Sequence, residues 1–211
     1  LDELGYKIVA ISDISGCIYN PEGLDIPLIM RELQTAGSIE KLSRYEIYPK
    51  EKIFDVKSDV FIPAASSDTI NSETAPKLIK AGTKLVIEAA NIPTTAEAEK
   101  ILIQSGVWVI PDFIVNAGGV IGSYVEYKGG TEKEAFDLIN YKISVNVKLV
   151  LTLVQQNSLT PRKIAQEIAK TRVKRAMLLR RGAIDVAREY FARQKSLYEF
   201  MVPDLRNTTH P

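Results

Sequence analysis

The 211-residue chain is predicted to adopt an α/β fold, in which a mostly parallel sheet has helices on both faces and a helical C-terminal segment follows. Two observations indicate this fold. Short apolar runs rich in β-branched residues alternate with helical patterns of roughly ten residues, which is typical of βαβ units. After Gly129-Gly130 the strand-like runs stop, and only long helical patterns remain.

Four apolar runs are the predicted strands. Each is short and bounded by turn residues, as expected for a strand buried on both faces of a parallel sheet. The runs cover residues 6–12, 59–63, 84–88 and 107–111. Between the last two, Thr94 and Glu97 have the spacing of a capping box, which predicts a helix that Gly106 ends.

The C-terminal part is predicted to contain three helices, at about residues 132–156, 161–179 and 183–201, before a tail at 203–211. Thr131 and Glu134 have capping-box spacing, and Thr160 precedes a proline at the first helical position. The domain prediction is therefore a Rossmann-like part at residues 1–130 and a helical segment with a tail at 131–211.

Ligands of a Rossmann-like sheet bind beyond the carboxyl ends of its strands. Asp13 and residues 63–66, 88–91 and 111–116 should therefore line one crevice. No G-x-G-x-x-G precedes Asp13, and only five residues precede the first predicted strand. The phosphate-binding loop is expected upstream of residue 1, so the chain is interpreted as an excised fragment with a truncated dinucleotide-binding domain.

Composition removes several classes of function. With 27 basic and 26 acidic residues, the formal net charge of +1 favours neither a nucleic-acid nor a membrane partner. The chain has one cysteine, Cys17, and one histidine, His210, which argues against a disulfide framework, a metal site or a histidine-based triad. No apolar run approaches the ~20 residues of a membrane span, and a cytoplasmic protein is expected.

Three segments could contact a ligand, and each also has an ordinary structural explanation. Asp13 could accept hydrogen bonds from an adenosine ribose, or it could be a turn residue. Asn91 could bind a carboxamide such as that of nicotinamide, or simply occupy a strand-to-helix turn. The segment 116–123 could bring a ligand to the amides of a helix end, or its glycines could allow close helix packing.

Residues 162–181 are strongly basic, with eight Lys or Arg and one acid, Glu167. A nucleic-acid patch is one interpretation. Ile164, Ile168, Val173 and Leu178 recur at roughly helical spacing through the stretch, and interleaved aromatic residues are missing. The solvated face of an amphipathic helix is therefore the favoured interpretation.

Taken together, four motifs resemble the family of dehydrogenases that act on glutamate, leucine, phenylalanine or valine, and most closely its glutamate dehydrogenases. The order and spacing of these motifs match the family over roughly residues 5–180. The motifs are SDISGCIYNPEG at 12–23, IPAAS at 62–66, EAANIPTT at 88–95 and PDFIVNAGGVIGSYVE at 111–126. Ala89 and Ile92 stand where the family usually has glycine.

The resemblance implies a role for eight residues. Ser12 and Asp13 would lie at the cofactor, with Asp13 holding the adenosine ribose, while Ala64 and Ala65 would pack along the dinucleotide. Asn91 and Asn116 would contact its nicotinamide end, and Val120 and Ser123 would contact the substrate. The cofactor is NAD or NADP, and Asp13 favours NAD because a carboxylate repels a 2′-phosphate.

The implied reaction is the reversible deamination of glutamate to 2-oxoglutarate and ammonia. The resemblance assigns proton transfer to a lysine and an aspartate of a preceding substrate domain, so no catalytic residue is expected here and the chain alone is predicted to be inactive. The parent is expected to be a homo-oligomer, a hexamer by resemblance. Two alternatives stay open: a non-catalytic Rossmann-like binding module, and a leucine, valine or phenylalanine dehydrogenase domain.

Overall fold

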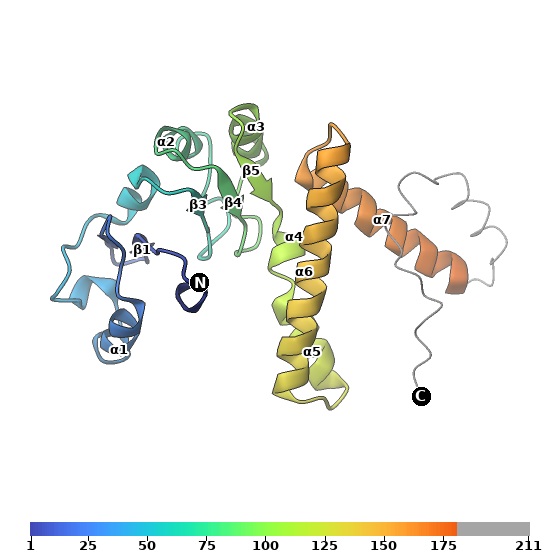
Figure 1. Ribbon diagram of the computed structural model, residues 1–211, viewed down its shortest axis with the longest axis horizontal. Helices are drawn as coiled ribbons and strands as arrows, with labels where there is room; N and C mark the ends of the chain where they lie inside the picture. The colour runs from blue at the N-terminus through green and yellow to red at the C-terminus, as the bar shows by residue number, and fades with distance from the viewer. Residues whose placement is uncertain (181–211) are drawn as a thin grey trace. The chain divides into compact units, whose positions relative to one another are not determined.

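The computed structural model describes residues 1–180, which are coloured by position in Figure 1. They form two compact units, Leu1–Asp112 and a second that begins at Phe113. The predicted helix at 183–201 and the tail at 203–211 lie outside the described residues, and a domain boundary at residue 130 stays a prediction. Within residues 1–180, no helix combines the length and the apolar character needed to cross a membrane.

The first unit begins with an antiparallel hairpin. After a short 3-10 helix, η1 (Asp2–Leu4), strand β1 (Ala10–Ser12) pairs with β2 (Cys17–Tyr19). The prediction of a strand at 6–12 buried on both faces is wrong, because β1 is short and only half-buried. The chain turns back after Ser12, so β1 pairs with β2 in a separate two-stranded sheet instead of entering the parallel sheet. The apolar pattern did not predict β2.

A small hydrophobic core lies between this hairpin and the segment that follows. The segment contains helix α1 (Ile26–Ala36) and the 3-10 helices η2 (Ile39–Lys41) and η3 (Lys50–Asp55). Asp25 begins α1 by accepting a hydrogen bond from the Leu28 amide. The buried residues of this core are Ile18, Leu24, Ile29, Ile39 and Leu42.

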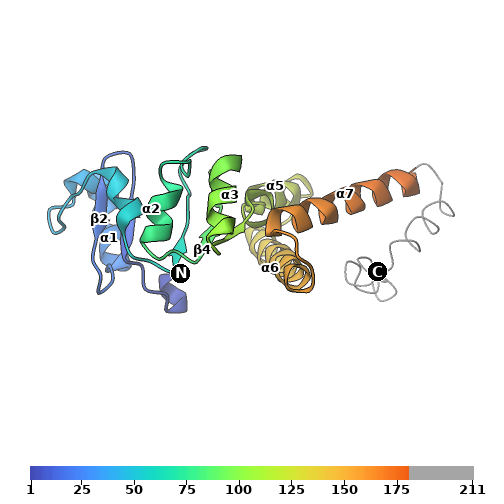
Figure 2. The same ribbon diagram turned by 90° about the horizontal axis from the view of Figure 1, so that it is seen from above.

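The predicted parallel sheet is present. Its strands β3 (Val60–Phe61), β4 (Leu85–Ile87) and β5 (Trp108–Ile110) pair in the order β3-β4-β5. Helices α2 (Ala75–Lys80) and α3 (Ala96–Gln104) contact each other, and Figures 1 and 2 show them side by side. The α/β fold class is therefore confirmed.

One face of the sheet carries the main core of the unit. Phe61, Val86 and Val109 are in register across the three strands and pack with buried residues of α2 and α3. The ring of Phe61 also stacks on Phe54 of η3, with 5.6 Å between the ring centroids. Because η3 also contacts β1 and β2, it joins the hairpin to the sheet.

Helix α3 begins one residue later than the sequence indicated. Its N-cap is Thr95, whose hydroxyl accepts a hydrogen bond from the Ala98 amide at 3.2 Å. The predicted Thr94–Glu97 capping box is wrong, because Thr94 forms a parallel bridge with Ile70 and is buried in an extended conformation. The helix ends as expected before Gly106, which has a φ of 81°.

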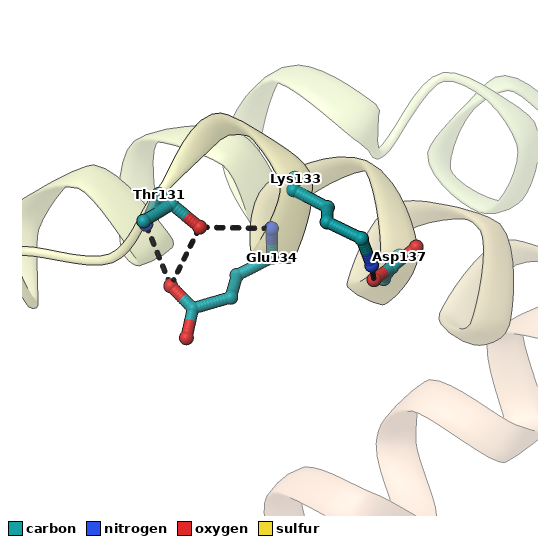
Figure 3. Close-up of polar contacts among 4 residues, drawn as sticks. All are labelled: Thr131, Lys133, Glu134 and Asp137. Carbon is teal, nitrogen blue, oxygen red and sulfur yellow. Dashed lines mark hydrogen bonds and ion pairs between the residues drawn. The ribbon is translucent and has the colours of Figure 1, made fainter.

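The second unit is helical. Its elements are α4 (Asp112–Val115), which starts at the last residue of the first unit, α5 (Gly118–Tyr127), α6 (Glu132–Gln156) and α7 (Pro161–Arg180). Figure 3 shows the capping box of α6: Thr131 Oγ1 accepts from the Glu134 amide at 3.3 Å, and Glu134 Oε2 accepts from the Thr131 amide at 2.6 Å. This box is confirmed.

Helices α6 and α7 share a core in which Val150, Leu153, Ile164 and Ile168 are buried. The Thr160 hydroxyl accepts a bond from the Lys163 amide at 3.4 Å, so Thr160 begins α7 as predicted. The apolar stripe of α7 does not stay buried, because Val173 is 58% exposed.

Two basic residues of α7 have partners within the chain. Lys170 pairs with Glu167 at 2.8 Å, and Arg172 donates to the Asn146 side chain of α6 at 3.0 Å. Together with the buried Ile164 and Ile168, these contacts show that α7 is amphipathic, and the absence of a nucleic-acid partner stays a prediction.

Candidate functional site

The loops that follow β3 and β4 are held together by main-chain hydrogen bonds. The Ala90 amide donates to the Pro63 carbonyl at 2.9 Å, and the Asp68 amide donates to the Ile92 carbonyl at 3.0 Å. The Ile70 amide donates to the Pro93 carbonyl at 2.8 Å. Main-chain bonds therefore join two loops from the carboxyl end of the sheet into one surface.

Two buried carboxylates connect the end of β5 to the same surface. Glu88, at the end of β4, is completely buried, and its Oε2 accepts a hydrogen bond from the Asp112 amide at 2.9 Å. The Asp112 carboxylate in turn accepts a bond from the Ile92 amide at 2.9 Å. We call this surface, made of residues 63–70, 88–93 and Asp112, the strand-end platform.

Glu88 and Asp112 were predicted only as parts of the segments that line the crevice, and neither was given a role of its own. Both stood inside the quoted motifs, and each is an acid at the end of a strongly apolar strand. That placement was the available signal, because a buried carboxylate needs hydrogen-bond donors and here finds them in strand-end amides. These two hydrogen bonds lie within the strand-end platform, so both residues help to hold it in position.

Three predicted cofactor residues lie on the strand-end platform. Ala64, Ala65 and Asn91 are all exposed, at the carboxyl ends of β3 and β4. Methyl side chains leave the main chain open to close approach, while an asparagine amide offers both a donor and an acceptor. The strand-end platform therefore exposes small side chains and one amide side chain at the edge of the parallel sheet.

Asp13 is a turn residue of the β1–β2 hairpin. Its Oδ1 accepts bonds from the Ser15 amide at 2.7 Å, the Ser15 hydroxyl at 2.6 Å and the Gly16 amide at 3.2 Å. Its Oδ2 accepts from the Ile39 amide at 3.2 Å. The turn interpretation is thus supported, and because a carboxylate has about four lone-pair sites, a ribose hydroxyl could still approach Oδ2.

The ionised form of Asp13 is favoured in the folded chain. Burial by itself raises the pKa of the carboxyl, but hydrogen bonds from Ser15, Ile39 and Gly16 outweigh it and hold the pKa below its ordinary value of 3.8. Ser12, beside it, donates its hydroxyl to the Lys50 carbonyl at 3.1 Å. Ser12 is the last residue of β1 and Asp13 follows it in the turn, so neither lies at the end of a strand of the parallel sheet.

The predicted substrate residues lie on α5, in the second unit. Val120 is 78% exposed and Ser123 is also exposed, while Asn116 is half-buried just before the helix. At 100° per residue, Val120 and Ser123 lie on one side of the helix, opposite Gly118 and Gly122. That side of α5 is therefore accessible.

Two glycines of α5, Gly118 and Gly122, face Ile139 of α6. A methyl group added at Gly118 would lie 3.6 Å from Cγ2 of Ile139 on α6, and one added at Gly122 would lie 4.0 Å from Cδ1 of the same side chain. Both distances are ordinary van der Waals separations, so this packing does not require glycine, and both interpretations of residues 116–123 stay predictions. A ligand role for Asn116, Val120 and Ser123 stays a prediction.

Among the residues that the structure describes, no group of three or more histidine, cysteine, aspartate or glutamate side chains is placed to hold a metal ion. The pKa of the Cys17 thiol is raised by its burial, although Lys52 acts in the opposite direction. Neither observation points to a metal site or a reactive thiol among the described residues.

Comparison with known proteins gives a consistent family. The family model described as glutamate/leucine/phenylalanine/valine dehydrogenase matches residues 1–181. A glutamate dehydrogenase of Aeropyrum pernix is 41% identical over 191 residues, which is 85% of this chain and 45% of that protein. An NADP-specific glutamate dehydrogenase of Saccharolobus shibatae is 36% identical over 188 residues, which is 85% of this chain and 44% of that protein.

A solved structure agrees with these sequence relatives. The hetero-hexameric glutamate dehydrogenase of Thermus thermophilus, in its leucine-bound form, matches with a TM-score of 0.66 and 26% identity over 76% of this chain and 38% of that one. The chain spans less than half the length of these relatives.

Proposed function

Because the chain belongs to the glutamate/leucine/phenylalanine/valine dehydrogenase family, which matches it over residues 1–181, we propose that it is the cofactor-binding part of a glutamate dehydrogenase. The complete protein would convert glutamate reversibly to 2-oxoglutarate and ammonia. The observation that carries the proposal is the strand-end platform, which exposes Ala64, Ala65 and Asn91 at the carboxyl end of a parallel sheet.

The cofactor, when bound, accepts the hydride that leaves the α-carbon of the substrate. The residues of this chain bind and orient. Asp13 would hold the adenosine ribose, with Ser12 beside it, and Asn91 and Asn116 would hold the carboxamide end. Glu88 and Asp112 keep the strand-end platform in place, so the cofactor meets groups that are already ordered and less entropy is lost on binding.

Val120 and Ser123 would contact the substrate from the accessible side of α5. A serine hydroxyl can donate a charge-assisted hydrogen bond to the side-chain carboxylate of glutamate. An apolar amino acid offers no such acceptor. Ser123 is therefore the residue that favours glutamate over leucine, valine or phenylalanine in this proposal.

The choice of cofactor is proposed to be NAD, with NADP as the alternative. A carboxylate at Asp13 repels the 2′-phosphate of NADP, yet the relative from Saccharolobus shibatae is NADP-specific. We further propose a homo-oligomeric, cytoplasmic protein. The Thermus thermophilus relative is hetero-hexameric, so oligomers occur among the structural relatives, although that one contains more than one kind of chain.

The proposal is tested by a substrate panel with the complete protein. Glutamate, leucine, valine and phenylalanine are each oxidised with NAD and with NADP, and kcat/KM is measured for every pair. We expect the highest kcat/KM with glutamate and no turnover by the 211-residue chain alone. A faster reaction with leucine would assign another branch of the family, and no turnover with any pair would favour a non-catalytic binding module.

A further inference from the structure

The strand-end platform contains two residues with an unusual backbone. Asp68 has a φ of 54° and Ile92 a φ of 47°, and among residues 1–180 they are the only non-glycine residues with positive φ. Aspartate adopts this left-handed conformation fairly often, whereas a β-branched residue does so rarely. Pro93 restricts the backbone of the preceding residue further. Ile92 is therefore the strained position of the platform.

Hydrogen bonds on both sides hold Ile92 in this conformation. Its amide donates to the Asp112 carboxylate at 2.9 Å, and its carbonyl accepts from the Asp68 amide at 3.0 Å. The next residue, Pro93, is buried, and its carbonyl accepts from the Ile70 amide. The loops after β3 and β4 and the end of β5 thus fix one residue together.

The side chain of Ile92 gains nothing from this arrangement within the described chain. It is 64% exposed and belongs to none of the three hydrophobic cores. Backbone strain that persists without a packing gain is typical of residues that meet a ligand. Here the strained residue directly follows Asn91, at the edge of the sheet where ligands of such folds bind.

We propose that Ile92 contacts the cofactor, with its apolar side chain packed against the nicotinamide ring whose carboxamide Asn91 binds. This inference rests on the proposed function, because it requires a nicotinamide dinucleotide on the strand-end platform. The residue adds an apolar contact to the polar ones, and the platform holds it in position before the ligand arrives.

Two substitutions with side chains of similar shape distinguish the apolar contact from the backbone strain. Ile92→Leu keeps an apolar side chain and removes the β-branch, while Ile92→Asn has a similar shape, is polar, and suits the left-handed region. Both variants should fold at least as stably as the wild type, since both relax the strain. A variant whose melting temperature changes while its Kd for the cofactor does not would therefore indicate a purely structural role for Ile92.

The test is calorimetric titration of the complete protein with NAD, NADP and ADP-ribose, the last of which lacks the nicotinamide. Ile92→Asn should raise the Kd for the preferred dinucleotide about fivefold to tenfold, which is the scale of losing part of a buried apolar side chain. Ile92→Leu should stay within about twofold of the wild type. The Kd for ADP-ribose should not change in either variant.

Met30 on α1 provides a matched control, since it is 58% exposed. Met30→Leu and Met30→Asn should leave every Kd unchanged. If Ile92→Asn and Ile92→Leu bind the dinucleotide equally well, or if Ile92→Asn weakens ADP-ribose to the same degree, the inference is wrong while the proposed function stands. If the wild type binds neither NAD nor NADP, the proposed function fails and the inference fails with it.

Discussion

The two compact units present their candidate residues by different means. In the first, main-chain hydrogen bonds and the buried carboxylates of Glu88 and Asp112 hold the strand-end platform. In the second, α6 and α7 are held by apolar packing, and α5 exposes one side of a helix. Buried hydrogen bonds hold individual residues of a loop in place, whereas apolar packing holds a whole helix and leaves its other face accessible. A substitution in one unit should therefore change the unfolding signal of that unit more than the signal of the other.

The largest effect is expected from the packing of the second unit. Leu153 is 1% exposed in the core of α6 and α7, so Leu153→Ala should lower the free energy of unfolding by about 3 kcal/mol through lost burial and a cavity. The only tryptophan of the chain, Trp108, lies in β5 of the first unit. In denaturant unfolding, the helical circular-dichroism signal should shift more than the Trp108 fluorescence.

Leu159, which is 41% exposed after α6, is the matched control for this substitution. Leu159→Ala should change the unfolding free energy little. Equal losses for Leu153→Ala and Leu159→Ala would mean that the core of α6 and α7 does not stabilise the second unit.

A smaller effect is expected from the strand-end platform. Asp112→Ala removes the acceptor of the Ile92 amide and should cost about 2 kcal/mol, the scale of a hydrogen bond to a charged group. Here the Trp108 fluorescence transition should shift more than the helical signal. Asp137→Ala removes only an exposed carboxylate that pairs with Lys133 and should have little measurable effect. Equal shifts for both variants would contradict a structural role of Asp112.

The smallest effect concerns pH and Asp13. Hydrogen bonds favour its carboxylate in the folded chain and lower its pKa, so the stabilisation is present above the ordinary aspartate pKa of 3.8 and is lost as the pH falls through the lower native pKa. Asp13→Asn should therefore cost ~1 kcal/mol or less at neutral pH, and the difference should shrink as the pH falls below 3.8. A difference that stays constant with pH would show that the charge of Asp13 is not involved.

Patterns local in sequence predicted most of the fold. The three parallel strands were found because alternating apolar runs and helices record burial directly, and α6 was found because Thr131 and Glu134 make a complete capping box. The β1–β2 hairpin was not predicted, because the Asp13 carboxylate builds its turn through bonds to Ser15 and Gly16. The start of α3 was missed by one residue, because Thr94 pairs with Ile70 in a distant loop.

The sequence predicted where three of the candidate residues lie, but not the contacts that hold them there. Ala64, Ala65 and Asn91 lie at strand ends, as the apolar pattern required. Asp112 and Glu88 act through contacts between residues twenty or more positions apart, which spacing along the chain cannot reveal. Isoleucine gives no local signal for the left-handed backbone of Ile92, and the one indication was that the family usually has glycine at this position.

The proposed division between a cofactor-binding unit and a substrate-contacting helix is tested most directly by Ser123→Ala in the complete protein. In this variant, kcat/KM is measured for glutamate and for norvaline, and the Kd is measured for the cofactor. The glutamate value should fall roughly tenfold to a hundredfold, or about 1.4 to 2.8 kcal/mol, while norvaline, which lacks the carboxylate, loses little and the cofactor Kd is unchanged. Equal losses for glutamate and norvaline, or a weaker cofactor Kd, would contradict the assignment of Ser123 to the substrate carboxylate.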